Sequence, residues 1–232
     1  MAACAQADSA GSSASEIVAS ALRAAEPTPG LAWIDVGCGT GAALRQVRDL
    51  HQPARLTGID IIDFLADDLR ADVHLTVGPA EDSVATAEPA DRVLMIETVE
   101  HLEAPWSVLR AVARLVKPGG ILVVSTPNVA SLRHRIELLV RGRLTAFRSD
   151  NRPHLTPVLP HVVARILEEE EFVPEEPTFA GRDVLPLTGG RLWTPTNAMR
   201  FPVLGNISVV HKAKRPRIAS ALASSSSYDS QG

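Results

Sequence analysis

The stretch Trp33-Ile34-Asp35-Val36-Gly37-Cys38-Gly39-Thr40-Gly41 decides the fold, because an apolar run enters a glycine cluster directly before a helical pattern. Glycines at such a turn let the backbone approach a ligand without Cβ clashes, and a helix N-terminus offers free N–H groups to an anionic group. Asp60 ends the next predicted strand. An acid at that position hydrogen-bonds ribose hydroxyls in nucleoside-binding folds. The stretch therefore predicts a site for a nucleoside-containing ligand.

Outward from this turn, short apolar runs alternate with helical patterns. Repeated strand, helix and strand units imply right-handed crossovers and a parallel sheet, so we predict an α/β fold. The predicted strands cover residues 31–37, 55–61, 73–78, 91–98 and 121–127, and the predicted helices cover residues 41–50, 64–69 and 105–116. Proline is suitably placed in the first turn of the last of these helices.

The two ends of the chain differ in composition from its middle. Ala- and Ser-rich residues without periodicity predict disordered tails over residues 1–14 and 216–232, leaving one domain over residues 15–215. Within this domain a leading amphipathic helix begins at Ser15, and a helix over 158–170 precedes strands at 172–181 and 206–215. We expect the proline-bearing segment from Arg182 to Gly205, with Trp193 and Phe201, to form an irregular excursion that covers a pocket.

Composition excludes several classes of protein. The chain has 232 residues, 45% of them hydrophobic and 22% charged, which suits one globular domain. A formal net charge of -4 excludes an overall basic surface for nucleic acid. Cys4 and Cys38 do not make a disulfide framework, and neither a signal peptide nor an apolar run long enough to cross a bilayer is present. We therefore expect a cytoplasmic protein.

The glycine motif admits two kinds of cofactor. Gly37, Gly39 and Ala42 satisfy the dinucleotide pattern G-x-G-x-x-G/A, which leaves an NAD-binding oxidoreductase open. Asp35 ahead of the first glycine and a third glycine at Gly41 give D-V-G-C-G-T-G. This run resembles motif I of the class I S-adenosylmethionine-dependent methyltransferases.

The resemblance continues through VLMIETVEHLEAPWSVLRAVARLVKPGGILVVSTPN (residues 93–128), which is similar to ubiquinone-biosynthesis O-methyltransferases. It implies a Rossmann-like seven-stranded mixed sheet in the order 3-2-1-4-5-7-6, with only the last strand antiparallel. It also implies S-adenosylmethionine as cofactor, with Asp35 and the glycine turn facing its methionine part, Asp60 its ribose and Ala80 and Glu81 its adenine. The implied cofactor residues are Asp35, Gly37, Cys38, Gly39, Thr40, Gly41, Asp60, Ile61, Ala80, Glu81 and Ile96. The chain departs from the family at Pro79, where an acid is usual, and this puts adenine recognition by that position in doubt.

The run Glu97-Thr98-Val99-Glu100-His101 supplies the candidate catalytic groups. Two carboxylates and an imidazole on one turn suit a divalent cation that binds an acceptor hydroxyl and lowers its pKa. The run resembles the metal-binding segment of ubiquinone-biosynthesis and small-RNA 3′-end 2′-O-methyltransferases, and we match His154 to the further histidine of the latter. The predicted ligands are thus Glu97, Glu100, His101 and His154. Two alternatives stay open: His101 or His154 acts as a general base, or Glu100 and His101 only stabilise the following turn.

A cluster of arginines follows the fifth strand, in a stretch that is helical by pattern. It suits either an acidic acceptor or a solvated helix whose buried face is Leu132, Ile136, Leu139 and Val140. His134 and His161 are expected to be exposed. The arginines are Arg133, Arg135, Arg141, Arg143, Arg148 and Arg152.

The function that we predict from the sequence is S-adenosylmethionine-dependent O-methylation of a small-molecule acceptor, such as a quinone precursor, natural product or sugar. An aromatic content of 4% argues against RNA as the acceptor, because single-stranded RNA is usually bound on aromatic surfaces. The alternatives are an RNA 2′-O-methyltransferase, an NAD-binding oxidoreductase and an inactive cofactor-binding regulatory module. The sequence does not indicate an oligomeric state.

Overall fold

The computed structural model describes residues 11–144, 147, 154–181 and 208–217. Its strands are β1 (Ala32–Val36), β2 (Arg55–Asp60), β3 (Val73–Val77), β4 (Ala90–Ile96), β5 (Val116–Pro127), β6 (Val173–Pro174), β7 (Thr178–Ala180) and β8 (Ser208–Lys214). Its α-helices are α1 (Gly11–Ala24), α2 (Ala42–His51), α3 (Ala80–Thr86), α4 (Pro105–Arg114), α5 (Leu132–Arg141) and α6 (Pro160–Glu169). Two short 3-10 helices are η2 (Asp67–Leu69) and η3 (Val99–His101).

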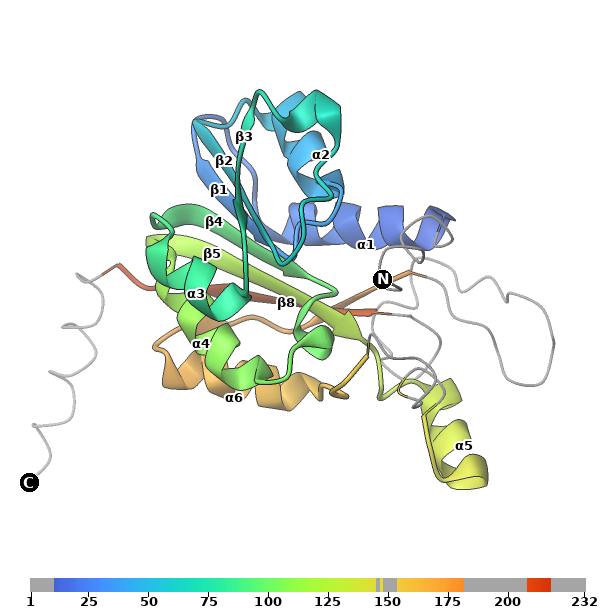
Figure 1. The fold of residues 1–232 in the computed structure, drawn as a ribbon. Helices are drawn as coiled ribbons and strands as arrows, with labels where there is room; N and C mark the ends of the chain where they lie inside the picture. The colour runs from blue at the N-terminus through green and yellow to red at the C-terminus, as the bar shows by residue number, and fades with distance from the viewer. Residues whose placement is uncertain (1–10, 145–146, 148–153, 182–207, 218–232) are drawn as a thin grey trace, which may run out of the picture.

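One central sheet joins all the described strands (Figure 1). Its order is β3-β2-β1-β4-β5-β8-β6, with β7 also paired to β8. The first five strands are parallel, and β8 runs antiparallel to β5, β6 and β7. The predicted α/β fold and strand order are confirmed. Strand β8 takes the place of the expected seventh strand, and the expected sixth strand is divided into β6 and β7.

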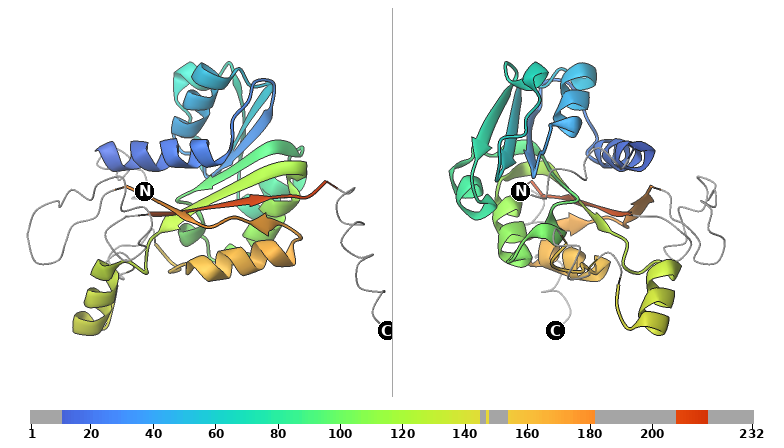
Figure 2. Two further views of the ribbon diagram at one scale, coloured as in Figure 1. Left: turned by 180° about the vertical axis from the view of Figure 1, so that it is seen from behind. Right: turned by 45° about the vertical axis from the view of Figure 1, so that its right-hand side comes forward.

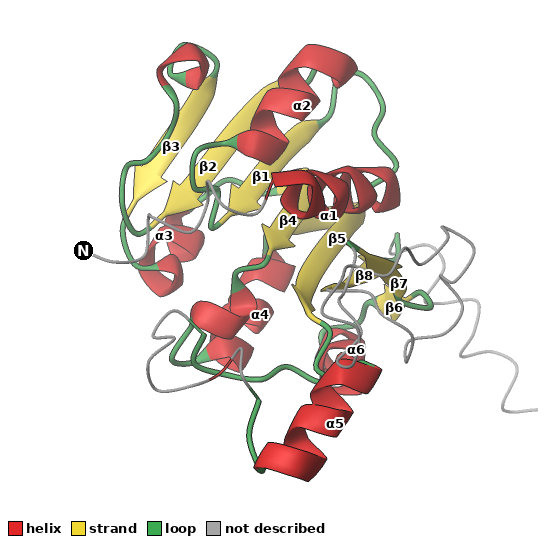
Figure 3. Cartoon of the chain, turned by 90° about the vertical axis from the view of Figure 1, so that its right-hand side faces the viewer, coloured by secondary structure: helices red, strands yellow, loops and turns green. Residues whose placement is uncertain are grey.

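Helices cover both faces of the sheet, as the views in Figures 2 and 3 show. On one face, α1 and α2 pack over an apolar cluster centred on Trp33, with Leu22 and Leu44 as buried members. On the other face, α3, α4 and α6 pack over a second cluster that includes Leu109 and Leu167. Among the described residues no helix is long and apolar enough to cross a membrane.

The parallel strands place the candidate residues at one edge of the sheet. Because β1, β2 and β4 run in the same direction, their carboxyl ends bring the glycine turn, Asp60 and Glu97 to the same side. Ligands of open α/β sheets bind at this edge. The fold therefore gathers the predicted cofactor and catalytic residues in one region.

Three predicted boundaries differ from the structure. The helix expected over residues 64–69 is wrong apart from the short η2, because the Asp63 side chain accepts a hydrogen bond from Leu65 N and favours a turn. Strand β5 begins at Val116 rather than residue 121, and the pairing of β4 with β5 shifts register between Ala90 and Arg92. Helix α1 begins at Gly11 rather than Ser15.

Helix α5 exposes part of its predicted buried face. Leu139 is 86% exposed and Val140 74%, whereas His134 and Glu137 are buried. The expected burial was therefore wrong for Leu139 and Val140, whereas Leu132 and Ile136 are half-buried, and the expected exposure of His134 was wrong. His134 is buried because its Nδ1 lies 2.8 Å from the carbonyl oxygen of Asn128 and 3.2 Å from Ser131 Oγ.

Some sequence-based expectations lie outside the described residues. They concern Cys4, Arg148, Arg152, the segment from Arg182 to Gly205 with Trp193 and Phe201, and both tails beyond residues 11 and 217.

Candidate functional site

The glycine turn between β1 and α2 is held by backbone hydrogen bonds. Gly37 N and Cys38 N both donate to the carbonyl oxygen of Ile59 at the end of β2, at 2.8 and 3.2 Å. Gly37, Gly39 and Gly41 all have a positive φ, which L side chains rarely adopt. A Cβ on Gly37 would lie 2.3 Å from Thr98 Oγ1, so close packing as well as backbone conformation requires glycine there.

Asp60 is tied to this turn by its side chain. Its Oδ2 accepts a hydrogen bond of 2.7 Å from Gly39 N, and its Oδ1 accepts one of 3.3 Å from Ile62 N. The carboxylate is therefore held beside the glycine turn, where the resemblance expects the ribose of the cofactor.

Asp35 is the most unusual acid of the cofactor region. Its side chain is 3% exposed, and Oδ1 is buried without a hydrogen-bond partner. Burial, together with the negative charge of Asp60, raises the pKa of Asp35 from 3.8 to about 7. A buried acceptor without a donor fits a cationic ligand group, and S-adenosylmethionine carries an ammonium group on its methionine part.

The other predicted cofactor residues border the same edge of the sheet. Ile61 follows β2 and is 68% exposed, whereas Ile96 ends β4 and is half-buried. Ala80 and Glu81 form the first turn of α3, and Pro79 caps that helix. Cys38 is buried, which raises the pKa of its thiol, and Thr40 is exposed. Ile61 and Thr40 are therefore open to a ligand, while the Cys38 side chain packs against Gly58 of β2.

The E-x-x-E-H run follows β4 and turns through η3. Glu97 has a positive φ of 49°, and its Oε1 accepts a hydrogen bond of 2.8 Å from Ser125 Oγ on β5. Burial raises the pKa of Glu97 to about 7. The Glu97 side chain therefore points toward β5. It is not part of the cluster that Glu100, the next acid of the run, forms with two histidines.

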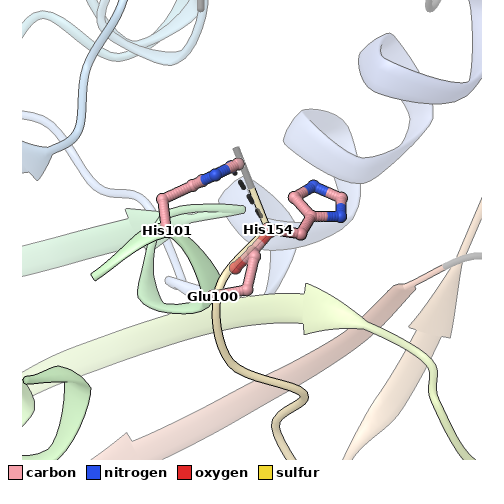
Figure 4. Close-up of side chains that lie close together, drawn as sticks. All are labelled: Glu100, His101 and His154. Carbon is pink, nitrogen blue, oxygen red and sulfur yellow. Dashed lines mark ion pairs between the residues drawn. The ribbon is translucent and has the colours of Figure 1, made fainter. Parts of the chain in front are cut away.

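Glu100, His101 and His154 form that group, and Figure 4 shows their side chains together. One ligand atom from each lies within 4.8 Å of the other two. His101 Nε2 is 3.8 Å from Glu100 Oε1, and the two imidazole rings are 4.9 Å apart between centroids. A carboxylate and two imidazoles suit a borderline divalent cation.

The buried carboxylate of Glu100 is the notable member. It is 0% exposed, and neither Oε1 nor Oε2 has a hydrogen-bond partner. Burial and the nearby charge of Glu97 raise its pKa well above the usual range. A buried carboxylate is costly unless a proton or a cation neutralises it, so the residues present fit a metal ion.

Backbone hydrogen bonds bring His154 to this place although it is distant in sequence. Leu155 N and Thr156 N both donate to the carbonyl oxygen of Glu100, at 2.8 and 3.1 Å. His154, which directly precedes Leu155, is therefore held beside η3.

Sequence reasoning missed two neighbours of the site. Phe147 lies with its ring centroid 5.4 Å from that of His154. Asn128 is buried and directly follows β5, and its carbonyl oxygen anchors His134 of α5. Ser131 caps α5 by accepting a hydrogen bond from His134 N. A serine before a helical pattern is a cap signal, and it was the available sequence signal for the contact between His134 and Asn128.

Comparison with protein families gives one match over most of the chain. The family described as a methyltransferase domain matches residues 12–174. Among curated proteins, the chain is 34% identical over 118 residues to the ubiquinone biosynthesis O-methyltransferase of Maricaulis maris, covering 47% of this chain and 46% of that protein. It is 36% identical over 119 residues to the Cereibacter sphaeroides enzyme of the same name, covering 46% and 45%. The matched region is thus about half the length of these curated relatives.

Solved structures share the fold at low sequence identity. A SAM-dependent methyltransferase from Archaeoglobus fulgidus superposes with a TM-score of 0.62 at 19% identity, covering 85% of this chain and 92% of that one. A chain of the complex between the Haloferax volcanii Trm112 methyltransferase activator and a methyltransferase gives a TM-score of 0.67 at 18% identity, covering 92% and 94%. The N-methyltransferase NodS from Bradyrhizobium japonicum, solved with S-adenosyl-L-homocysteine, gives 0.56 at 15% identity, with 86% of each chain covered.

Proposed function

The chain belongs to the methyltransferase-domain family, and from this premise we propose that it uses S-adenosylmethionine to methylate an oxygen of a small hydroxyl-bearing acceptor. The names of the curated relatives, which are O-methyltransferases of ubiquinone biosynthesis, support oxygen as the acceptor atom. The group of Glu100, His101 and His154 supports an acceptor with two adjacent hydroxyls, because a cation held there would favour such a pair of oxygen ligands.

The cofactor is held in this proposal by the edge formed by β1, β2 and β4. Asp35 accepts hydrogen bonds from the ammonium of the methionine part, the glycine turn accommodates that part, and Asp60 meets the ribose hydroxyls. Ile61 and the first turn of α3, with Ala80 and Glu81, border the adenine. S-adenosylmethionine supplies an activated methyl group whose thioether leaving group needs no protonation.

The remaining task of the protein is to place the acceptor oxygen in line with the methyl group and to remove its proton. Glu100, His101 and His154 would hold a divalent cation, which would bind the acceptor oxygens and lower the pKa of the hydroxyl. Glu97 stands beside this group, held by Ser125, and would orient the turn or complete the ligand set. The observation that carries the proposal is the fully buried Glu100 carboxylate without a hydrogen-bond partner, directly beside two histidines.

The test is calorimetric titration of Mg²⁺, Mn²⁺ and Zn²⁺ into the protein saturated with S-adenosyl-L-homocysteine. We expect one specific site in the wild type, its loss in Glu100→Gln, and its retention in Glu103→Gln, where an exposed acid of the same segment is neutralised. Methyl transfer to 3,4-dihydroxybenzoate should fall by about a hundredfold or more in Glu100→Gln and with a chelator.

Two outcomes would contradict this assignment. If no cation binds specifically to the wild type, or if Glu100→Gln binds it equally well, the metal-assisted mechanism is wrong. Methyl transfer that persists without metal would then assign proton removal to His101 or His154. A fall in kcat at low pH that disappears in His101→Asn or His154→Asn would identify which of them acts.

A further inference from the structure

Glu97 has a backbone conformation that is unusual for its place in the fold. Among the described residues other than glycine, four have a positive φ, and three of them, Glu26, Gln52 and Glu171, lie just after the ends of α1, α2 and α6. Left-handed residues commonly end helices. Glu97, with a φ of 49°, instead follows a strand, β4, at the edge of the sheet where the candidate site lies. Strain of this kind persists only where surrounding contacts hold it, and it is concentrated at functional sites.

The left-handed turn at Glu97 directs two consecutive side chains to different strands. Thr98 Oγ1 lies 3.1 Å from the carbonyl oxygen of Val36 at the end of β1, beside the glycine turn. Glu97 Oε1 accepts a hydrogen bond of 2.8 Å from Ser125 Oγ on β5. Because β4 lies between β1 and β5 in the sheet, Glu97 stands between the cofactor strand and β5, with its carboxylate held on the β5 side.

One buried hydroxyl holds both the backbone and the side chain of Glu97. Ser125 is 0% exposed, and its Oγ donates to Glu97 Oε1 and accepts a hydrogen bond of 3.0 Å from Glu97 N. Glu97 N also donates to the backbone carbonyl oxygen of Ser125, at 3.2 Å. The pairing of β4 with β5 therefore does not need the hydroxyl, and the two contacts of the hydroxyl serve the position of Glu97.

The next residue of β5 gives a contrast. Thr126 is also 0% exposed, but its Oγ1 has no hydrogen-bond partner. Successive side chains of a strand face opposite sides of the sheet, so Thr126 lies on the face opposite to Ser125. Of these two buried hydroxyls, only that of Ser125 contacts a residue of the candidate site.

Glu97 also acts electrostatically on the group of Glu100, His101 and His154. Its negative charge contributes to the raised pKa of Glu100, so the two carboxylates lie within electrostatic reach of each other. A second carboxylate beside Glu100 increases the attraction of the group for a cation, because the two negative charges add. This attraction depends on where the Glu97 carboxylate is held.

We propose that Ser125 is a positioning residue of the candidate site, whose hydroxyl holds the Glu97 carboxylate beside the group of Glu100, His101 and His154. In this role Ser125 acts through Glu97 and contacts neither cofactor nor acceptor. The inference rests on the proposed function, because it names the residue that orients one acid of the same site. Side chains that orient the surroundings of a metal ion contribute about 10- to 100-fold to metal affinity or activity.

Two measurements on Ser125→Ala test the inference. Calorimetric titration of Mn²⁺ into the protein saturated with S-adenosyl-L-homocysteine should show about tenfold weaker binding than in the wild type, with the affinity for S-adenosyl-L-homocysteine unchanged. The kcat for methyl transfer to 3,4-dihydroxybenzoate should fall about 10- to 100-fold. The matched control is Thr126→Val, which removes a buried hydroxyl from the next residue of the strand and should leave both quantities as in the wild type.

A double-mutant cycle with Glu97→Ala separates positioning from a general effect on packing. Ser125→Ala should lower Mn²⁺ affinity and kcat in the wild-type background and should have no further effect when Glu97→Ala is already present. Equal losses in both backgrounds would overturn the inference. Unchanged Mn²⁺ affinity and kcat in Ser125→Ala, while Glu100→Gln abolishes Mn²⁺ binding, would also overturn it and leave the proposed function intact.

Failure of the proposed metal-assisted mechanism gives a different result. In that case the wild type binds no cation specifically. A kcat that Ser125→Ala lowers only where Glu97 is present would then support the positioning role without a cation.

Discussion

At the scale of single residues, Asp35 shows how ligand binding and stability conflict. Its carboxyl group is buried with Oδ1 unpartnered, and its pKa is raised to about 7. An unpartnered buried acceptor costs free energy in the absence of ligand, and a cationic donor recovers that cost on binding. Asp35 therefore destabilises the ligand-free protein and strengthens the binding of a cationic ligand.

The first prediction concerns Asp35→Asn. A charge-assisted hydrogen bond to the ligand ammonium is worth about 1.5–3 kcal/mol, so S-adenosyl-L-homocysteine should bind about 10- to 100-fold more weakly at pH 7.5. Calorimetry measures the change, with Asp82→Asn as control, because Asp82 is an exposed acid on α3. Equal affinity in wild type and Asp35→Asn would show that Asp35 does not contact the cofactor.

At the scale of elements, the turn from β1 to α2 depends on the close approach of Thr98. Thr98 Oγ1 lies 3.1 Å from the carbonyl oxygen of Val36 and 3.0 Å from that of Ile96, so it bridges the ends of β1 and β4. The Thr98 side chain therefore occupies the space that a Cβ on Gly37 would need. Gly39 also has a positive φ, but a Cβ there meets nothing within 4 Å.

The second prediction compares these two glycines. Gly39→Ala should lower the free energy of unfolding by about 1 kcal/mol, from backbone strain alone. Gly37→Ala should lower it by about 2–5 kcal/mol, because the methyl group also collides with Thr98. Urea unfolding measures both, and adding Thr98→Ala to Gly37→Ala should recover part of the loss. Equal losses in the two single variants would contradict the role of Thr98.

The elements also show which features can be predicted from sequence. The glycine turn, β4 and α4 are predictable because local pattern and tertiary packing agree, as in the buried residues Val108, Leu109 and Val112 of α4. Helix α5 is predictable as a helix but not in orientation, because the contact of His134 with Asn128 decides which side faces inward. The proximity of His154 to Glu100 depends on backbone hydrogen bonds across some fifty residues, which no local pattern specifies.

At the scale of the whole molecule, ion pairs link regions that are far apart in the chain. Lys212 on β8 lies 2.5 Å from Glu26 after α1 and 2.9 Å from Glu175 after β6, and Lys214 lies 3.0 Å from Glu26. Hydrogen bonds from these lysines lower the pKa of Glu26 to about 2. Stability from this pairing is present above pH 4.5 and is lost as the pH falls toward 2. Glu26 is half exposed, so water screens the pairing and its contribution is small.

Asp35 and His211, two of the buried titratable groups, affect stability nearer to neutral pH in opposite directions. The raised pKa of Asp35 gives stability below pH 3.8 that is lost as the pH rises toward 7, because only the unfolded chain ionises over that range. Burial lowers the pKa of His211 from 6.5 to about 4, so its contribution is present above pH 6.5 and is lost as the pH falls toward 4. The wild-type profile alone therefore mixes these opposing effects with those of Glu97 and Glu100, whose pKa values are also raised by burial.

The last prediction separates them by comparing two proteins over the same pH range. Between pH 5 and its folded-state pKa of about 7, the Asp35 carboxyl ionises in the unfolded chain but stays protonated in the folded protein. At 1.4 kcal/mol per pH unit, these two units lower the free energy of unfolding of the wild type by at most about 3 kcal/mol. Without ligand, the free energy of unfolding of Asp35→Asn should thus gain up to that amount on the wild type as the pH rises. Glu26 and His211 titrate identically in both proteins and cancel in the difference, which urea unfolding at each pH measures. A difference that stays constant across this range would show that Asp35 is ionised at pH 5 in the folded protein.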